Sequence, residues 1–291
     1  MKDYIIATSS TCDLTRDYLD EHQIPFIAYS YVMDDKVYED DCKESTRLDT
    51  YHLMRDGKLL KTSQITVYAY HEFFKGLMDT GKDVLFMDMS IEMSHSYISA
   101  QEASEQIKKE YPNQKFYMMD TRCISGGLGL LIKKLIALKE EGKSYDEVIA
   151  YGEANKLKVM HRFTVDNLKW LKLGGRLSNA SAMVGTLLNI KPVMYVPDDG
   201  KLVAASKIRG RKQAILALLE GMKRDMENPD GQEIDILNAD CLEDAEFLRD
   251  KIQETFPTVG KIEITGLGVV IGAHCGPGLL TVFYMGSSRQ A

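Results

Sequence analysis

The amino-acid sequence predicts an α/β protein of two α/β domains, the first with a parallel sheet flanked by helices and the second with a mixed sheet and helices. Three observations support this class. The length of 291 residues suits two cores of roughly 150 residues each. A hydrophobic content of 44% with 27% charged residues is typical of a globular protein. Strand patterns also alternate with helical patterns along almost the whole chain.

The first half of the chain predicts a parallel sheet with helices on both faces. Consecutive strands that are joined by a helix run in the same direction, because the helix returns the chain to the starting edge. We expect strands at 4–8, 84–89 and 115–120, helices at 15–21, 46–56, 67–80, 96–111 and 128–141, and a hairpin of 26–32 with 37–38 around Asp34-Asp35-Lys36.

A second α/β pattern begins after a long polar helix, and we place the domain boundary at about residue 158. The domains are then 1–158 and 159–291. Asp198-Asp199-Gly200 is typical of a hairpin turn and adds an antiparallel pair to this domain. We expect strands at 159–165, 191–196, 202–207, 233–238, 261–265 and 279–285, and helices at 166–172, 180–188, 213–226 and 242–255.

Composition narrows the classes of function. The chain has no apolar run near the roughly 20 residues that cross a bilayer, and its first residues do not resemble a secretory signal. An odd number of cysteines without close pairing argues against a disulfide framework and a zinc site, and favours a cytoplasmic location. The net charge of −7 makes nucleic-acid binding unfavourable. The five cysteines are Cys12, Cys42, Cys123, Cys241 and Cys275.

Positive charge gathers in one segment of this acidic chain. Residues 168–212 hold nine lysines and arginines and two aspartates, a local charge of +7, so the rest carries −14. A solvated face is the more common explanation of such a segment. The alternative is a docking surface for an acidic or phosphate-bearing partner.

Three hydroxyl-bearing segments stand close to predicted helix starts. Thr62-Ser63-Gln64 lies between two helical patterns, and helix capping is its more frequent role. Ser94-His95-Ser96 and Ser125-Gly126-Gly127 each follow a predicted strand and precede a helix. Ligands of open parallel sheets bind beyond the carboxyl ends of strands, where helix amino termini favour anions. The three segments could therefore converge on one head group.

The segment Gly272–Gly278 places His274 and Cys275 among small residues, at the end of what we expect to be an apolar strand. The pair suggests a nucleophile with its base, but a free cysteine is more often an inert apolar residue. Gly266-x-Gly268-x-x-x-Gly272 resembles a dinucleotide fingerprint with one residue too many. Because we also expect no helix after it, we predict no NAD site.

Six motifs in order resemble one family over essentially the whole chain. The sequence is similar to the DegV family of bacterial fatty-acid-binding proteins. The motifs are Thr62-Ser63-Gln64, Met93-Ser94-x-Ser96-Tyr97-x-Ser99-Ala100, Asp120-Thr121 with Ser125-Gly126-Gly127-Leu128-Gly129, Leu168-Lys169-Trp170-Leu171-Lys172-Leu173-Gly174-Gly175-Arg176, Ile190-Lys191-Pro192 and His274-Cys275-Gly276-Pro277-Gly278.

The resemblance implies a long-chain fatty acid, such as palmitate, stearate or oleate, in a tunnel between the two domains. It implies that Thr62 and Ser94 bind the carboxylate with His274 nearby, and that no cofactor is needed. Some members carry the acyl chain for a two-component fatty acid kinase and present the carboxylate to a separate ATP-dependent kinase, which makes acyl phosphate for phospholipid synthesis. We expect a supporting pocket from Ser63, Ser96, Ser125, Gly126, Gly276 and Gly278, and a kinase-facing surface from Arg176, Lys207 and Arg209.

The resulting hypothesis is a cytoplasmic fatty-acid carrier that is not an enzyme by itself and that can touch a membrane surface transiently. Two alternatives remain, an acyl-transfer enzyme that uses Cys275 with His274 and a lipid sensor without a kinase partner. The chain also departs from the family pattern at three places. Ser9 replaces an acidic residue, His95 replaces a glycine beside the proposed carboxylate ligand, and Ile65 stands where proline is common.

Overall fold

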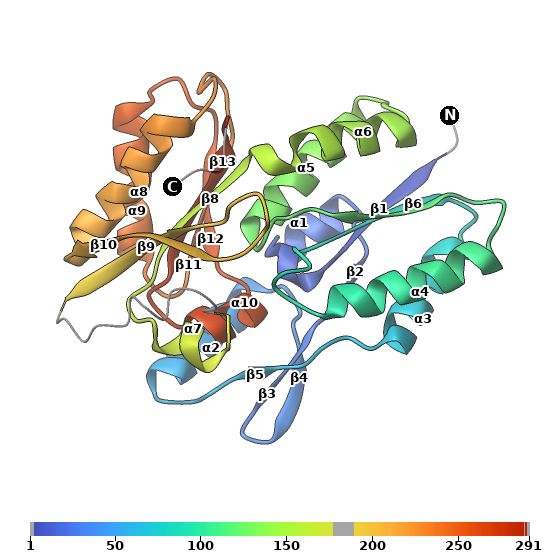
Figure 1. Cartoon of the computed structure of the whole chain (residues 1–291), viewed down its shortest axis with the longest axis horizontal. Coiled ribbons are helices and arrows are strands. Elements are labelled where there is room, and N and C mark those ends of the chain that lie inside the picture. The colour runs from blue at the N-terminus through green and yellow to red at the C-terminus, as the bar shows by residue number, and fades with distance from the viewer. Residues whose placement is uncertain (1–2, 177–188, 288, 290–291) are drawn as a thin grey trace.

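The computed structural model of the chain describes residues 3–176, 189–287 and 289 (Figure 1). The helix expected at 180–188 lies outside these residues. The described chain forms a four-stranded sheet, a six-stranded sheet and a small three-stranded sheet, which confirms the α/β class. None of the described helices has both the length and the apolar character that a bilayer span requires.

The first half of the chain supplies the four-stranded and three-stranded sheets with the helices around them. Its elements are β1 (Tyr4–Ser9), the 3-10 helix η1 (Ser10–Cys12), α1 (Arg16–Glu21), β2 (Phe26–Ile27), β3 (Ser30–Met33), β4 (Lys36–Glu39), α2 (Glu44–Arg55), β5 (Lys61–Thr62), α3 (Val67–Met78), β6 (Asp83–Asp88), α4 (Ser96–Glu110), β7 (Phe116–Asp120), α5 (Gly126–Glu140) and α6 (Tyr145–Asn155).

The second half supplies the six-stranded sheet, one 3-10 helix and four further described α-helices. Its elements are the 3-10 helix η2 (Lys156–Lys158), β8 (Val159–Thr164), α7 (Lys169–Leu173), β9 (Ile190–Tyr195), β10 (Val203–Arg209), α8 (Arg211–Asp225), β11 (Ile234–Asn238), α9 (Leu242–Thr255), β12 (Ile262–Gly266), α10 (Val269–Cys275) and β13 (Leu280–Met285).

The four-stranded sheet is parallel, as predicted, with the order β2-β1-β6-β7. All six residues of its central strand β6 are buried, because helices cover both faces. In Figure 1, α3 and α4 pack on one side of these strands and α5 and α6 on the other. The carboxyl ends of β1, β6 and β7 therefore point to one edge, from which the loops after Ser9, Asp88 and Asp120 leave.

The six-stranded sheet is mixed, as predicted, with the order β10-β9-β8-β13-β11-β12. Strands β11 and β12 are parallel and the other neighbours are antiparallel. Helices α8 and α9 cover one face, at the left of Figure 1, and enclose a core with Met160, Leu218 and Tyr284. The predicted turn at Asp198-Asp199-Gly200 does join the antiparallel strands β9 and β10.

Helix α5 belongs to the first half of the chain but packs against both large sheets. It contacts β6 on one side and β8, β11 and β13 on the other, and Figure 1 shows it crossing the centre of the molecule. Ten of its fifteen residues are buried, including Leu128, Leu131 and Leu135. A helix that is apolar over most of its surface has to be covered on more than one side, so α5 fills the space between the sheets.

Four local predictions were wrong. The segment 26–32 is not one strand, because its start pairs with β1 as β2 and its end forms the β3–β4 hairpin. Helix α3 is capped by Thr66, whose side chain accepts a hydrogen bond from the Ala69 N–H, and Thr62 lies in β5.

Residues 269–275 form α10 where we expected a strand end, so a helix does follow Gly268. The glycine spacing alone then argues against a dinucleotide site. Helix α7 begins at Lys169, three residues later than expected, after Asn167 accepts a hydrogen bond from its backbone N–H.

Candidate functional site

The two halves of the chain enclose a cavity of about 460 Å³, within the range of roughly 300–1,000 Å³ that is usual for ligand sites. Its wall is mostly apolar. The first half contributes side chains such as Met89 and Met93, and the second half contributes Phe163, Trp170 and Phe283. Polar groups gather at the end where the exposed residues Ser63 and Gln64 lie. The arrangement is suited to a long apolar ligand with one polar end.

Thr62 and His274 meet at the polar end of the cavity, although 212 residues separate them. Their Oγ1 and Nε2 atoms lie 2.9 Å apart. Thr62 is held by β5, which pairs with Tyr31 of β3, while His274 lies in the last turn of α10. The contact therefore joins one residue from each half at the mouth of the cavity.

Ser94 also lines the cavity, in the loop between β6 and α4. Its Oγ accepts a hydrogen bond from the backbone N–H of Ser96 at 3.2 Å, which leaves its own proton available to a ligand. The Ser96 hydroxyl is turned the other way and accepts from the Ile65 N–H at 3.1 Å. Ser96 thus connects the Ser94 loop to the segment that follows Thr62.

His274 is neutral at physiological pH. Burial, aided by the nearby positive charge of Arg176, lowers its pKa to about 4. A neutral imidazole carries one proton. When that proton is on Nε2, it is donated to Thr62, and the Thr62 hydroxyl is then free to donate to an anion.

Arg176, expected to face a partner, lines the cavity. Its Nη1 donates to the Gly174 carbonyl at 2.7 Å and its Nε to the Met93 carbonyl at 3.3 Å. The guanidinium thus lies beside the residue that precedes Ser94 and acts on the pKa of His274. A positive charge therefore stands close to the polar end.

The other predicted partner-facing residues lie elsewhere. Lys207 and Arg209 are exposed on β10, which is the edge strand of the six-stranded sheet. Their register partners on β9 are Pro192 and Ile190. Neither side chain lines the cavity, so both are free to meet another molecule.

Four of the predicted supporting residues stand behind the cavity wall. Ser96 braces Ser94, and Gly126 begins α5 against Phe283 and Leu237. Gly276 and Gly278 have φ angles of 77° and 86°. Any side chain at Gly276 would collide with the ring of Trp170, so the glycine permits the packing of a cavity-lining residue.

Ser63 and Ser125 are part of the wall itself. Ser63 is exposed at the mouth, and its backbone N–H donates to the Ser30 carbonyl at 2.9 Å. The Ser125 hydroxyl donates to the Asp13 carboxylate, so it is engaged within the protein. The Ser125 hydroxyl, unlike that of Ser94, is therefore not available to a ligand in this arrangement.

The inner part of the cavity is apolar in character even where its residues are polar. His161 donates from Nδ1 to the Val159 carbonyl at 2.9 Å and accepts at Nε2 from the Ile124 N–H at 3.1 Å. Both ring nitrogens are thus satisfied, and burial lowers the pKa of this histidine well below its usual value. The ring presents only its carbon edge, which suits contact with a hydrocarbon chain.

Cys275 lacks the features of an activated nucleophile. Burial raises the pKa of its thiol to about 12, whereas reactive cysteines have a lowered pKa. Adjacent residues of a helix do not face each other, and the His274 Nε2 is directed at Thr62. The geometry does not favour the acyl-transfer alternative.

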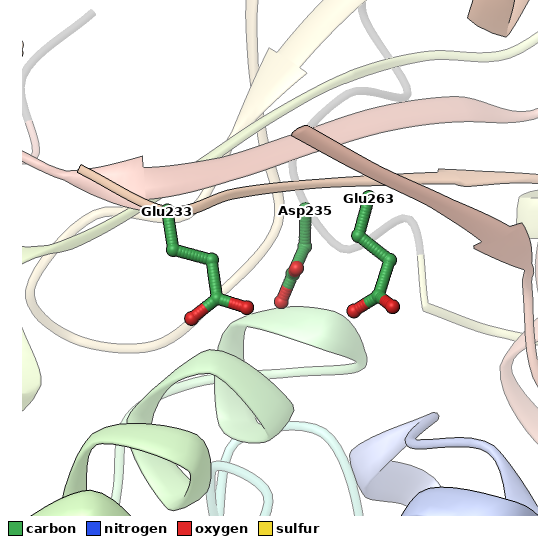
Figure 2. Close-up of side chains that lie close together, drawn as sticks. All are labelled: Glu233, Asp235 and Glu263. Carbon is green, nitrogen blue, oxygen red and sulfur yellow. The ribbon is translucent and has the colours of Figure 1, made fainter. Parts of the chain in front are cut away.

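Glu233, Asp235 and Glu263 form a cluster of carboxylates at the start of β11 and β12 (Figure 2). Lys133 of α5 occupies the position that a metal ion would take. Its Nζ lies 3.2, 2.8 and 2.6 Å from oxygens of the three carboxylates, in the order in which they are named. The ammonium group satisfies the cluster, which therefore serves to join α5 to the six-stranded sheet.

Comparison with known proteins identifies the family. A family model described as an uncharacterised protein family, DegV, matches residues 4–287. A DegV domain-containing protein of Clostridium perfringens is 36% identical over 291 residues, which covers 100% of both chains. The chain belongs to the DegV family.

Solved structures of other DegV proteins share this fold. One is a DegV family protein from Thermus thermophilus described as binding fatty acid, with 27% identity, a TM-score of 0.87 and coverage of 99% of this chain and 100% of that one. Another is the fatty acid kinase B3 protein of Streptococcus pneumoniae loaded with linoleic acid. It has 24% identity, a TM-score of 0.81 and coverage of 98% and 99%, and it supports the fold alone.

Sequence reasoning did not find every residue of this DegV cavity. Tyr29, Trp170 and His161 all line it, and none was a predicted site residue. Trp170 stands inside one of the six motifs and could have been noticed as the single tryptophan of the chain. Tyr29 and His161 have no such signal, because they reach the cavity only through the packing of the two halves.

Proposed function

We propose that this DegV protein binds one long-chain fatty acid in the cavity, with the carboxylate beside Thr62, Ser94 and His274. The main support is the 2.9 Å contact between Thr62 Oγ1 and His274 Nε2, which places two polar side chains together in the wall of a mostly apolar cavity. The DegV protein from Thermus thermophilus is described as binding fatty acid, and this supports the same ligand class here.

The free energy of binding would come mainly from the tail. Burying a methylene contributes about 0.8 kcal/mol, so about 14 methylenes give on the order of 10 kcal/mol before the costs of ordering. The hydroxyls of Thr62 and Ser94 would fix the direction of the chain, and Arg176 would favour the ionised head group. No cofactor is part of this proposal.

The fluorescence of Trp170 offers a direct binding assay, because the only tryptophan of the chain lines the cavity. Titration with oleate should change its emission, and native mass spectrometry of the purified protein should detect one C14–C18 fatty acid per chain. Thr62→Ala and Ser94→Ala should each weaken binding. Thr80→Ala is a matched control, because its hydroxyl donates to the Leu77 carbonyl at the opposite edge of the parallel sheet. Protein that neither carries nor takes up a fatty acid would refute the proposal.

The finer part of the proposal concerns what happens to the bound carboxylate. We infer that a separate ATP-dependent kinase phosphorylates it and that the exposed residues Lys207 and Arg209 contact this partner. Lys207→Glu with Arg209→Glu should then slow kinase-dependent turnover without changing oleate affinity. Lys108→Glu is the control, since Lys108 is also exposed but lies on α4. Unimpaired turnover would remove β10 from the kinase-facing surface, and no turnover by the wild type would favour a lipid sensor without a kinase.

A further inference from the structure

A third hydroxyl reaches the polar end of the cavity. Tyr29 stands between β2 and β3, lines the cavity and is only 2% exposed. Its backbone N–H is held by the Ser10 hydroxyl at 3.1 Å. The phenol hydroxyl has no hydrogen-bond partner of normal geometry within the part of the chain that the structure describes. A buried hydroxyl without a partner is energetically unfavourable, so its proton is available to a ligand in the cavity.

The surroundings of Tyr29 make its hydroxyl a donor. The hydroxyls of Ser94, Ser96 and Tyr70 lie close enough to influence its pKa. Burial is the largest influence and raises that pKa, so the phenol keeps its proton. The Ser96 hydroxyl accepts from the Ile65 N–H and can donate its own proton to the Tyr29 oxygen, which leaves the proton of Tyr29 for a further acceptor.

A buried chain of hydrogen bonds fixes the side chains behind Tyr29. The Tyr70 hydroxyl donates to Asp88 Oδ2 at 3.0 Å, and the Ser9 hydroxyl donates to Oδ1 of the same carboxylate at 2.7 Å. The Met89 N–H also donates to Oδ1, at 2.8 Å. Ser9 is the position at which this chain lacks the acidic residue of the DegV pattern, and Asp88 supplies a carboxylate beside it. Because the Tyr70 proton is committed to Asp88, its hydroxyl has a defined orientation beside Tyr29.

We propose that the Tyr29 hydroxyl donates a hydrogen bond to the carboxylate of the bound fatty acid next to Ser94, and so selects free acids over neutral lipids. This inference rests on the proposed function. A hydrogen bond to a charged acceptor is stronger than one to a neutral oxygen. A buried hydroxyl that has no partner of normal geometry among the described residues therefore favours a carboxylate over an alcohol. Tyr70 and Asp88 act as positioning residues for this donor.

The test compares two ligands that share a tail. Oleate and oleyl alcohol are titrated into the wild type and into Tyr29→Phe, with Trp170 fluorescence as the signal. A hydrogen bond to a charged group contributes about 1.5–3 kcal/mol, so Tyr29→Phe should weaken oleate binding about 10- to 150-fold and leave oleyl alcohol nearly unchanged. Tyr145→Phe is the control, because it also removes a buried hydroxyl, which donates to the Val84 carbonyl at 2.9 Å, but does not line the cavity.

Three other outcomes would contradict either the donor role of Tyr29 or the proposed function. Unchanged oleate affinity in Tyr29→Phe would overturn the donor role, and equal loss of both ligands would mean that Tyr29 only shapes the cavity. A wild type that binds neither ligand would overturn the proposed function itself. Incorporation of 3-fluorotyrosine at position 29 gives a second variant that keeps the hydroxyl. Its more acidic phenol should bind oleate more tightly, and weaker or equal binding would count against the inference.

Discussion

Replacement of Gly127 by alanine should destabilise the protein, because the glycine makes room for His161. A Cβ atom at position 127 would stand 2.7 Å from both Cδ2 and Cε1 of His161 and closer still to Nε2. Real Cβ contacts stay beyond about 3.0 Å. The ring is buried and hydrogen-bonded at both nitrogens, so it cannot move without losing the bond from Ile124.

The expected change in the free energy of unfolding combines two destabilising contributions and one stabilising contribution. Overpacking a core costs about 1–3 kcal/mol, and a buried N–H left without its acceptor costs about 1–3 kcal/mol. Alanine regains up to about 1 kcal/mol as a better helix former. The free energy of unfolding should therefore fall by about 1–5 kcal/mol, measured by urea denaturation. His161 also lines the cavity, so its displacement should weaken oleate binding.

Two further variants test whether the loss of stability comes from the steric clash with His161. Gly76→Ala lies within α3, and its Cβ would meet no atom within 4 Å, so it should stabilise the protein by about 0.5–1 kcal/mol. His161→Ala removes the ring that the methyl group introduced by Gly127→Ala would strike. The double variant should then be about as stable as His161→Ala alone. Wild-type stability of Gly127→Ala, or simple additivity in the double variant, would refute the steric argument.

Three other predictions follow from described contacts. Lys133→Met leaves three carboxylates without their cation and should lower the free energy of unfolding by about 3–5 kcal/mol. Because burial raises the pKa of Asp235 to about 6, the loss measured by urea denaturation should be smaller at pH 5 than at pH 7. An equal loss at both pH values would contradict the charge argument. The pKa of His274 falls from 6.5 to about 4 on folding, so the unfolded chain binds more protons between these pH values and the free energy of unfolding should decrease as pH falls through this window. His274→Asn should remove that part of the pH dependence. An unaltered pH profile would assign the dependence to other groups. Gly276→Ala forces alanine into a backbone region that is essentially reserved for glycine, with φ 77° and ψ 170°, and should lower the free energy of unfolding by about 1–3 kcal/mol. The variant should also alter the fluorescence emission of Trp170. Unchanged emission would argue against the packing of Trp170 on Gly276.

Much of the fold could be predicted because its elements have strong local patterns. The strand β6 contains a short apolar run, the helix α5 is rich in leucine and isoleucine, and Asp198-Asp199-Gly200 has the residue types of a hairpin turn. Helix α10 was missed because its seven residues include one glycine, begin with three β-branched residues and offer no polar face. Its apolar run resembles a strand, and only its burial between α7 and α2 makes a helix of it.

The site was predictable where a motif marks it and not where packing creates it. Thr62, Ser94 and His274 all line one cavity, as the resemblance implied. Capping frequency favoured the wrong interpretation of Thr62, because Thr66 provides the same hydroxyl four residues later. Tyr29 reaches the cavity from a loop without a motif, so only the three-dimensional arrangement reveals it.

The position of α5 between the two sheets has a consequence for how the chain folds. A fragment ending at residue 158 would keep α5 but expose the face that packs on β8, β11 and β13. A fragment starting at residue 159 would expose the matching sheet face and leave Asp235 without Lys133. Each piece would expose an apolar face that the other piece covers in the whole chain, so the two predicted domains should melt in a single cooperative transition. The cavity between them is then as durable as the fold as a whole, since the halves cannot part without unfolding together.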